Sequence, residues 1–81
     1  MEMNDLARRQ NLKDLAEAKR VELRDIPSKC RLSEPMTRLF KHFVGVDTDE
    51  VSLGQAAAKS GYPNSMARKR LDDIAISIRH L

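Results

Sequence analysis

A chain of 81 residues can hold one small domain, and its 41% apolar and 33% charged residues favour a folded domain over a disordered chain. The single cysteine, Cys30, excludes an internal disulfide, and two isolated histidines exclude a four-ligand structural metal site, so we expect neither a metal nor a cofactor. No apolar run approaches the roughly 20 residues of a membrane span and the N-terminus lacks a signal-peptide core, so we expect a cytoplasmic protein whose net charge of +3 is compatible with a nucleic-acid partner.

The absence of glycine and proline from residues 4–25 favours one long helix there. Asn4 is a suitable N-cap, and the carboxylate of Asp5 lies in the first turn, where the helix dipole favours negative charge. Acidic and basic residues surround a narrow apolar stripe, which consists of Leu12, Leu15, Leu23 and Ile26. Such a stripe suits an arm or an oligomer contact, and it equally suits a helix folded back on the core, so both alternatives remain open.

Pro27 predicts a break after the first helix, because proline lacks an N–H donor and disfavours the α conformation in the residue before it. We expect a hinge from there to about Leu32. Ser33 then suits an N-cap and Pro35 suits a first turn, so a second helix is predicted at residues 33–44. Its apolar face comprises Met36, Leu39, Phe40 and Phe43, and the acidic residues 47–50 form a connector.

A short third helix is predicted at residues 52–60. Ser52 and Gln55 have the spacing of a capping box, in which each side chain accepts a hydrogen bond from the other residue's backbone N–H. The inward residues of this helix are Leu53, Ala56 and Ala57. Gly61 then supplies the left-handed conformation at which many helices end.

A fourth helix is predicted at residues 65–80, with Asn64 or Ser65 as its N-cap. Intervals of four and three residues place five apolar side chains on one buried face, namely Ala67, Leu71, Ile74, Ile78 and Leu81. The opposite face carries Ser65, Arg68, Lys69, Asp72, Ile76 and Arg79. The whole pattern predicts an all-α fold, a small helical domain with a long N-terminal helix.

The last two helices have features of a helix-turn-helix. In that motif a short helix packs closely on a second one, whose first turn enters the major groove of DNA. Ala57 and Gly61, four residues apart, suit the close contact and the turn, and we expect that turn to be a residue or two longer than in repressors. The candidate DNA-contacting residues are polar or basic and lie around the start of the last helix: Lys59, Asn64, Ser65, Arg68, Lys69 and Arg70.

Two aspartates bear on this interpretation. Asp72 and Asp73 follow one turn later and would repel phosphates, so we expect only the N-terminal end of the helix to enter a groove. Arg68 with Asp72, and Lys69 with Asp73, also have i,i+4 spacing. The alternative is therefore a solvated, salt-bridged helix face that contacts no DNA.

From Leu32 onward, the segments LSEPMTRLFKHFV and SLGQAAAKSGYPNSMARKRL resemble the N-terminal DNA-binding domain of phage terminase small subunits. The resemblance covers about 50 residues, and its most specific part is QAAAKSGYPN, in which Pro63 stands where a serine is more usual. It implies a helix-turn-helix domain that binds the viral packaging site as an oligomeric ring and delivers it to a motor subunit. Such a protein acts in the host cytoplasm and is not itself an enzyme.

We accordingly expect an N-terminal charged helix and hinge at residues 1–31 and a helix-turn-helix DNA-binding domain at residues 32–81. The expected partners are double-stranded DNA, further copies of the chain, and a protein contacted by the N-terminal helix. Packaging-site recognition and transcription regulation both remain open. The alternative function is a small helical adaptor or inhibitor that binds a protein and not DNA. An enzyme is not expected, because no Ser/His/Asp, Cys/His or paired-carboxylate arrangement is recognisable.

Overall fold

The computed structural model describes residues 4–81, and this part of the chain contains five α-helices. They are α1 (Asp5–Ala18), α2 (Ile26–Lys29), α3 (Glu34–Val44), α4 (Leu53–Ser60) and α5 (Asn64–Arg79), and a short 3-10 helix, η1 (Leu23–Asp25), precedes α2. No strand occurs within the described residues, which confirms the all-α fold class. None of the described helices is long and apolar enough to cross a membrane. Residues 1–3, the start of the expected N-terminal segment, lie outside the described residues.

The first helix is shorter than the sequence predicts. α1 ends at Ala18, so the prediction of one helix over residues 4–25 is wrong. Arg20 has a φ of 57°, and its backbone N–H donates to the Glu17 carbonyl at 2.9 Å, while the Val21 N–H donates to the Ala16 carbonyl at 3.0 Å. These two bonds satisfy carbonyl groups at the end of α1. An arginine in the left-handed conformation carries no local signal of a helix end, which is why the sequence pattern missed it.

The hinge expected at Pro27 is a helix instead. Ile26 and Pro27 open α2, and both are buried. A proline in the first turn of a helix removes no hydrogen bond, because the N–H groups there have no partner within the helix. The prediction of a break at Pro27 is wrong for this reason. The chain turns after α2, at Arg31, whose φ is 52°.

The helix caps are confirmed at three of the four predicted starts. Asn4, Ser33 and Ser52 each accept a hydrogen bond from the backbone N–H three residues later, at 2.7, 3.4 and 3.2 Å. Gln55 completes the capping box of α4. At the other end of α3, Gly45 has a φ of 80°, so that helix ends at the predicted place. These signals are local in the chain, and each one needs only a few neighbouring residues to act.

The last helix begins within one residue of its predicted start, but the predicted N-cap residue is wrong. Pro63 is the N-cap of α5 and offers no side-chain hydrogen bond, while Asn64 is already helical. The φ of −61° and ψ of 153° at Pro63 give the extended backbone that an N-cap needs, so neither Asn64 nor Ser65 takes that position. Four of the five residues predicted on the inner face are buried, namely Ala67, Leu71, Ile74 and Ile78. Leu81 is 43% exposed, because α5 ends at Arg79.

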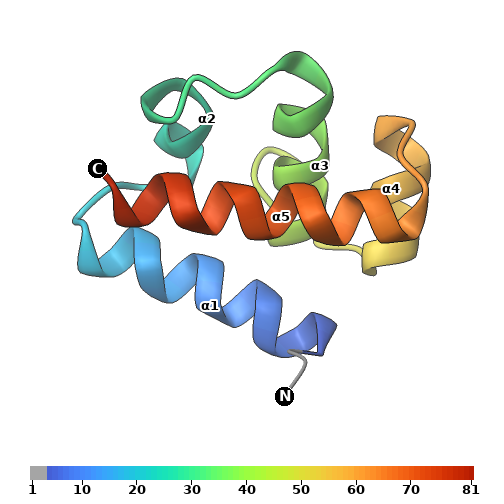
Figure 1. Ribbon diagram of the computed structural model, residues 1–81, viewed down its shortest axis with the longest axis horizontal. Helices are drawn as coiled ribbons and strands as arrows, with labels where there is room; N and C mark the ends of the chain where they lie inside the picture. The colour runs from blue at the N-terminus through green and yellow to red at the C-terminus, as the bar shows by residue number, and fades with distance from the viewer. Residues whose placement is uncertain (1–3) are drawn as a thin grey trace.

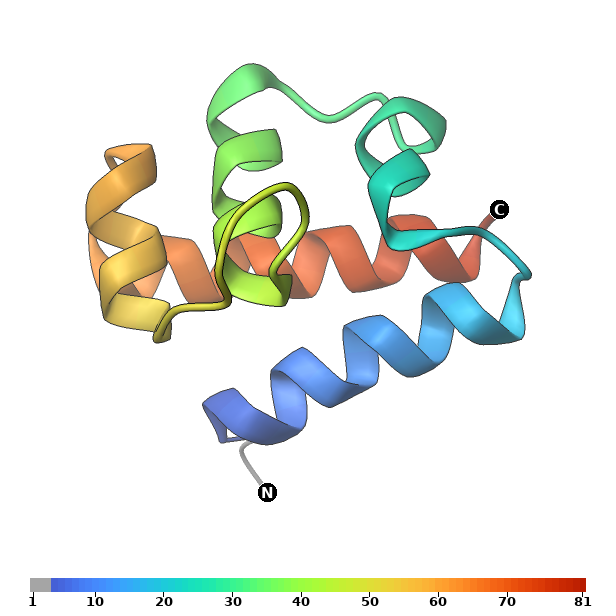
Figure 2. The ribbon, with the colours of Figure 1, turned by 180° about the vertical axis from the view of Figure 1, so that it is seen from behind.

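α1 lies alongside α5 and runs in the same direction, as both views of the ribbon show (Figures 1 and 2). Leu12 and Ile26 are fully buried, and Leu15 and Leu23 pack against the same core, so the narrow apolar stripe faces the rest of the domain. Of the two alternatives for this segment, the structure shows the helix folded back on the core. α3 and α4 pack on each other, and α5 crosses both of them (Figure 1).

Arg9 ties α1 to the connector between α3 and α4. Its Nε donates to the Phe43 carbonyl at 2.7 Å and its Nη2 donates to the Val51 carbonyl, while the guanidinium lies 4.7 Å from the centre of the Phe43 ring. Glu50 in the connector accepts from Lys13 at 2.9 Å and pairs with Arg9 at 3.3 Å. α1 therefore contacts the connector that leads into α4, and it also packs along α5. Both helices of the α4–α5 pair are thus positioned relative to α1.

Candidate nucleic-acid interface

Three residues, Gly61, Tyr62 and Pro63, join α4 to α5. The Tyr62 N–H donates to the Ala57 carbonyl at 2.9 Å, and Gly61 has a φ of 81°, a conformation that glycine adopts without strain. Pro63 then directs the chain straight into α5. The prediction of a turn longer than in repressors is therefore wrong, because three residues is at the short end of the 3–4 found in such helix pairs.

Small side chains let α4 approach α5 closely. Ala56 and Ala57 on α4 and Ala67 on α5 are all fully buried. A Cβ atom placed on Gly54 would lie 3.7 Å from the side-chain nitrogen of Asn64, so the first turns of the two helices also meet. This packing holds the first turn of α5 at one end of the domain.

The six candidate DNA-contacting residues lie around this first turn, and their surroundings differ. Lys59, Asn64, Ser65, Arg68 and Lys69 are exposed, and Arg70 is half-buried. Lys59 and Lys69 form no ion pair with any described residue, whereas Arg70 pairs with Asp73 at 3.2 Å. Arg68 pairs with Asp5 on α1.

The two i,i+4 ion pairs considered for α5 do not form. Asp72 pairs instead with Arg8 of α1, whose Nε donates to it at 2.9 Å. Asp73 is held by Arg70, three residues before it, and not by Lys69. That version of the salt-bridged face is therefore wrong. The aspartates that would repel a nucleic acid are each paired with an arginine within the domain.

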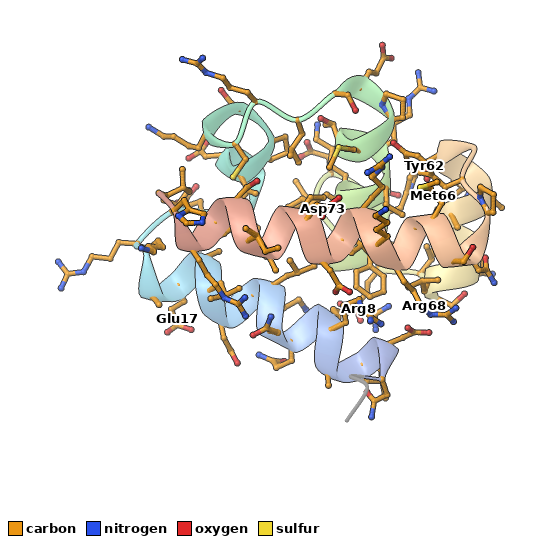
Figure 3. The ribbon with its side chains drawn as sticks, in the orientation of Figure 1. Arg8, Glu17, Tyr62, Met66, Arg68 and Asp73 are labelled. Carbon is orange, nitrogen blue, oxygen red and sulfur yellow. The ribbon has the colours of Figure 1, made fainter. Side chains whose placement is uncertain are left out.

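Arg8 is the centre of a network that sequence reasoning missed. It is only 8% exposed and bonds Asp72 and Asp5 together, with its Nη1 at 3.0 Å from Asp5, and Asp5 in turn accepts from Arg68. Figure 3 shows Arg8 and Arg68 reaching into the space between α1 and α5. One signal was available: Arg8 precedes Leu12 and Ala16 at intervals of four, so it lies on the buried side of α1.

The same region holds an open groove of about 820 Å³ between α1 and α5. Besides the network residues, its walls include Asn4, Asn11, Ile76 and Arg79. No group of three or more His, Cys, Asp or Glu side chains in residues 4–81 is arranged to hold a metal ion. Comparison with protein-family models, with curated proteins and with solved structures finds no match.

Proposed function

We propose that this chain binds double-stranded DNA through a helix-turn-helix formed by α4 and α5. The observation that carries the proposal is the geometry of the pair: a capped helix of eight residues, a three-residue turn with glycine at a φ of 81°, and a helix of 16 residues that begins with exposed polar side chains. Ala57 is fully buried, while Asn64, Ser65 and Met66 in the first turn of α5 are exposed. These features support the proposal, because helix-turn-helix motifs use a short helix, a tight turn and an exposed helix start to reach the major groove.

The charges around the first turn support a phosphate or base contact. Lys59 and Lys69 have no ion-pair partner among the described residues, so their ammonium groups are available to an anionic ligand. Repulsion from Asp72 and Asp73 is reduced, because Arg8 and Arg70 pair with those carboxylates. The first N–H groups of α5 also lack a side-chain cap, which suits a phosphate oxygen.

The biological role that we propose rests on the resemblance of residues 32–81 to phage terminase small subunits. In that role the protein recognises a packaging site, acts as a homo-oligomer and has no catalytic activity. A small transcriptional regulator uses the same helix pair on another DNA site. The two roles predict different preferred DNA but the same contacting residues.

Binding to DNA at several salt concentrations tests the proposal. Random duplexes and fragments of the native genome are titrated with the protein, and the dissociation constant is measured at each concentration. Phosphate contacts give a linear fall of log affinity with log salt, and site recognition adds tighter binding to particular fragments. Affinity that is undetectable at low salt on every fragment would rule out the DNA-binding function.

The second candidate is a small adaptor or inhibitor that binds a protein. One observation favours it: Ile76 is 49% exposed on α5, beside the groove between α1 and α5. Exposed apolar side chains next to charged ones suit the rim and centre of a protein interface. An Ile76→Glu variant that loses a protein partner but retains DNA affinity separates this surface from the one around Lys69.

A further inference from the structure

One contact links the proposed DNA-binding turn to α1. Arg68 donates to both carboxylate oxygens of Asp5, from Nε at 3.2 Å and from Nη2 at 3.4 Å. The two residues are 63 positions apart in the chain, so the contact exists only because α1 folds back along α5. Both side chains remain accessible, at 45% exposure for Arg68 and 40% for Asp5. A ligand can therefore reach this ion pair.

Asp5 is held in place independently of Arg68. Arg8 donates to it at 3.0 Å and is itself anchored to Asp72 at 2.9 Å. Asp5 also occupies the first turn of α1, where the positive end of the helix dipole favours a carboxylate. If Arg68 releases Asp5 and binds another anion, Asp5 still has Arg8 as a cationic partner. The change of partner therefore leaves neither the Asp5 carboxylate nor the Arg68 guanidinium unpaired.

We infer that the first turn of α1 competes with DNA for Arg68. The Asp5 carboxylate binds the guanidinium group that a phosphate or a guanine edge would otherwise bind. This inference rests on the proposed DNA-binding function. A carboxylate presents two oxygens to arginine in the same way as a phosphate does, so one guanidinium edge serves either partner. The intact protein binds DNA more weakly than its basic residues allow, because Arg68 must leave Asp5 first.

Charge removal at Asp5 tests the inference. Asp5→Asn keeps the shape of the side chain and removes its charge, and Asp5→Ala repeats the test without an acceptor. Asp14→Asn is the matched control, because Asp14 is exposed on the same helix, changes the net charge equally and bonds only Gln10 among the described residues, at 2.9 Å. Circular dichroism and a thermal melt establish that each variant is folded at the assay temperature.

Asp5→Asn is expected to tighten DNA binding by about 1.5- to 5-fold, which is the range an exposed ion pair contributes, when affinity is measured at about 0.15 M salt. Asp14→Asn is expected to change it by less than about 1.5-fold, because screening weakens a remote charge. In an Arg68→Ala background, Asp5→Asn should have no more effect than Asp14→Asn, since the competition requires both partners.

Equal effects of Asp5→Asn and Asp14→Asn in a protein that binds DNA would overturn the inference and leave the proposed function standing. Weaker binding by Asp5→Asn would also overturn it, because Asp5 would then orient Arg68 for DNA. If the original chain and all variants fail to bind DNA while remaining folded, the proposed function fails as well.

Discussion

Two neighbouring cations at the start of α5 have different surroundings. Lys69 is exposed and forms no ion pair with the described residues, whereas Arg68 is paired with Asp5. A DNA contact by Lys69 breaks no ion pair with a described residue, while one by Arg68 must displace a carboxylate. The two side chains are thus expected to contribute to binding in different ways, although both lie within the first two turns of one helix.

Substitution of these cations tests their contribution. Arg68→Ala is expected to weaken binding by about 1–3 kcal/mol and relax specificity if Arg68 contacts a base, and Lys69→Ala is expected to lower the salt slope by about one if Lys69 contacts a phosphate. Affinity is measured on the preferred fragment and on random DNA. Arg79→Ala is the control, because Arg79 lies at the far end of α5. If a variant that carries both Arg68→Ala and Lys69→Ala is folded and binds DNA with unchanged affinity, this part of α5 does not contact DNA.

Arg20 allows a prediction about stability. Its φ of 57° lies in the left-handed region, where a side chain is strained and glycine is not. Arg20→Gly is therefore expected to raise the free energy of unfolding by about 0.5–1 kcal/mol. Lys19→Gly is the control, because Lys19 has a φ of −87° and glycine should destabilise the protein there. Chemical denaturation measures both, and a stabilised Lys19→Gly variant would contradict this explanation.

At the scale of helices, the connector between α3 and α4 depends on α1. Lys13 donates a hydrogen bond to Glu50, and this bond lowers the pKa of the Glu50 carboxyl below its ordinary value, with partial desolvation opposing the shift and the charge of Arg9 adding to it. The folded protein thus keeps Glu50 ionised at a lower pH than the unfolded chain does. The connector is fixed to α1 most firmly when this carboxylate is charged.

The lowered pKa of Glu50 predicts a pH dependence. Its contribution to stability is fully present above the ordinary glutamate pKa and is lost as the pH falls through the lowered value of the folded protein. Glu50→Gln should therefore reduce the loss of stability on acidification. Thermal melts from about pH 3 to about pH 7 measure this, because that range extends on both sides of the ordinary glutamate pKa of about 4.3. Glu17→Gln, which removes an exposed carboxylate of α1, is the control and should change the pH profile less than Glu50→Gln does.

At the scale of the whole molecule, the core accounts for most of the apolar surface that suggested an oligomer. Leu12 and Ile26 are fully buried within one copy of the chain. Among residues 4–81, the large apolar side chains that remain exposed are Leu6, Met66, Ile76 and Leu81. Assembly is therefore a prediction that depends on these scattered residues, of which Ile76 lies beside the groove between α1 and α5.

We expect the protein to form a dimer or a higher oligomer, because Leu6 is 73% exposed and Ile76 is 49% exposed. Light scattering over a range of concentrations measures the mass. Ile76→Glu should lower the mass if that residue lies in the interface, and Asp14→Asn serves as a surface control. A mass of 9.2 kDa at every concentration would show that the chain is a monomer.

The sequence by itself determined the features that depend on a few neighbouring residues. The capping box of Ser52 and Gln55, the N-caps at Asn4 and Ser33, and the end of α3 at Gly45 all lie where the sequence predicts them. The inner face of α5 follows from its spacing alone, apart from Leu81. Capping hydrogen bonds and the spacing of apolar residues involve only one or two helical turns. The sequence therefore predicts them without knowledge of the fold.

The tertiary structure alone decided which distant side chains meet. Arg8 binds Asp72 across 64 positions of the chain, whereas Arg68, only four residues from Asp72, pairs with Asp5. The same folding of α1 along α5 brings Asp5 to Arg68 and hides the stripe that suggested an arm. Each of these charged residues has an oppositely charged residue three or four positions away in the chain, as well as others that only the fold brings near. Which partner it binds depends on how the helices pack, because an ion pair forms only where two charges come within a few ångströms of each other.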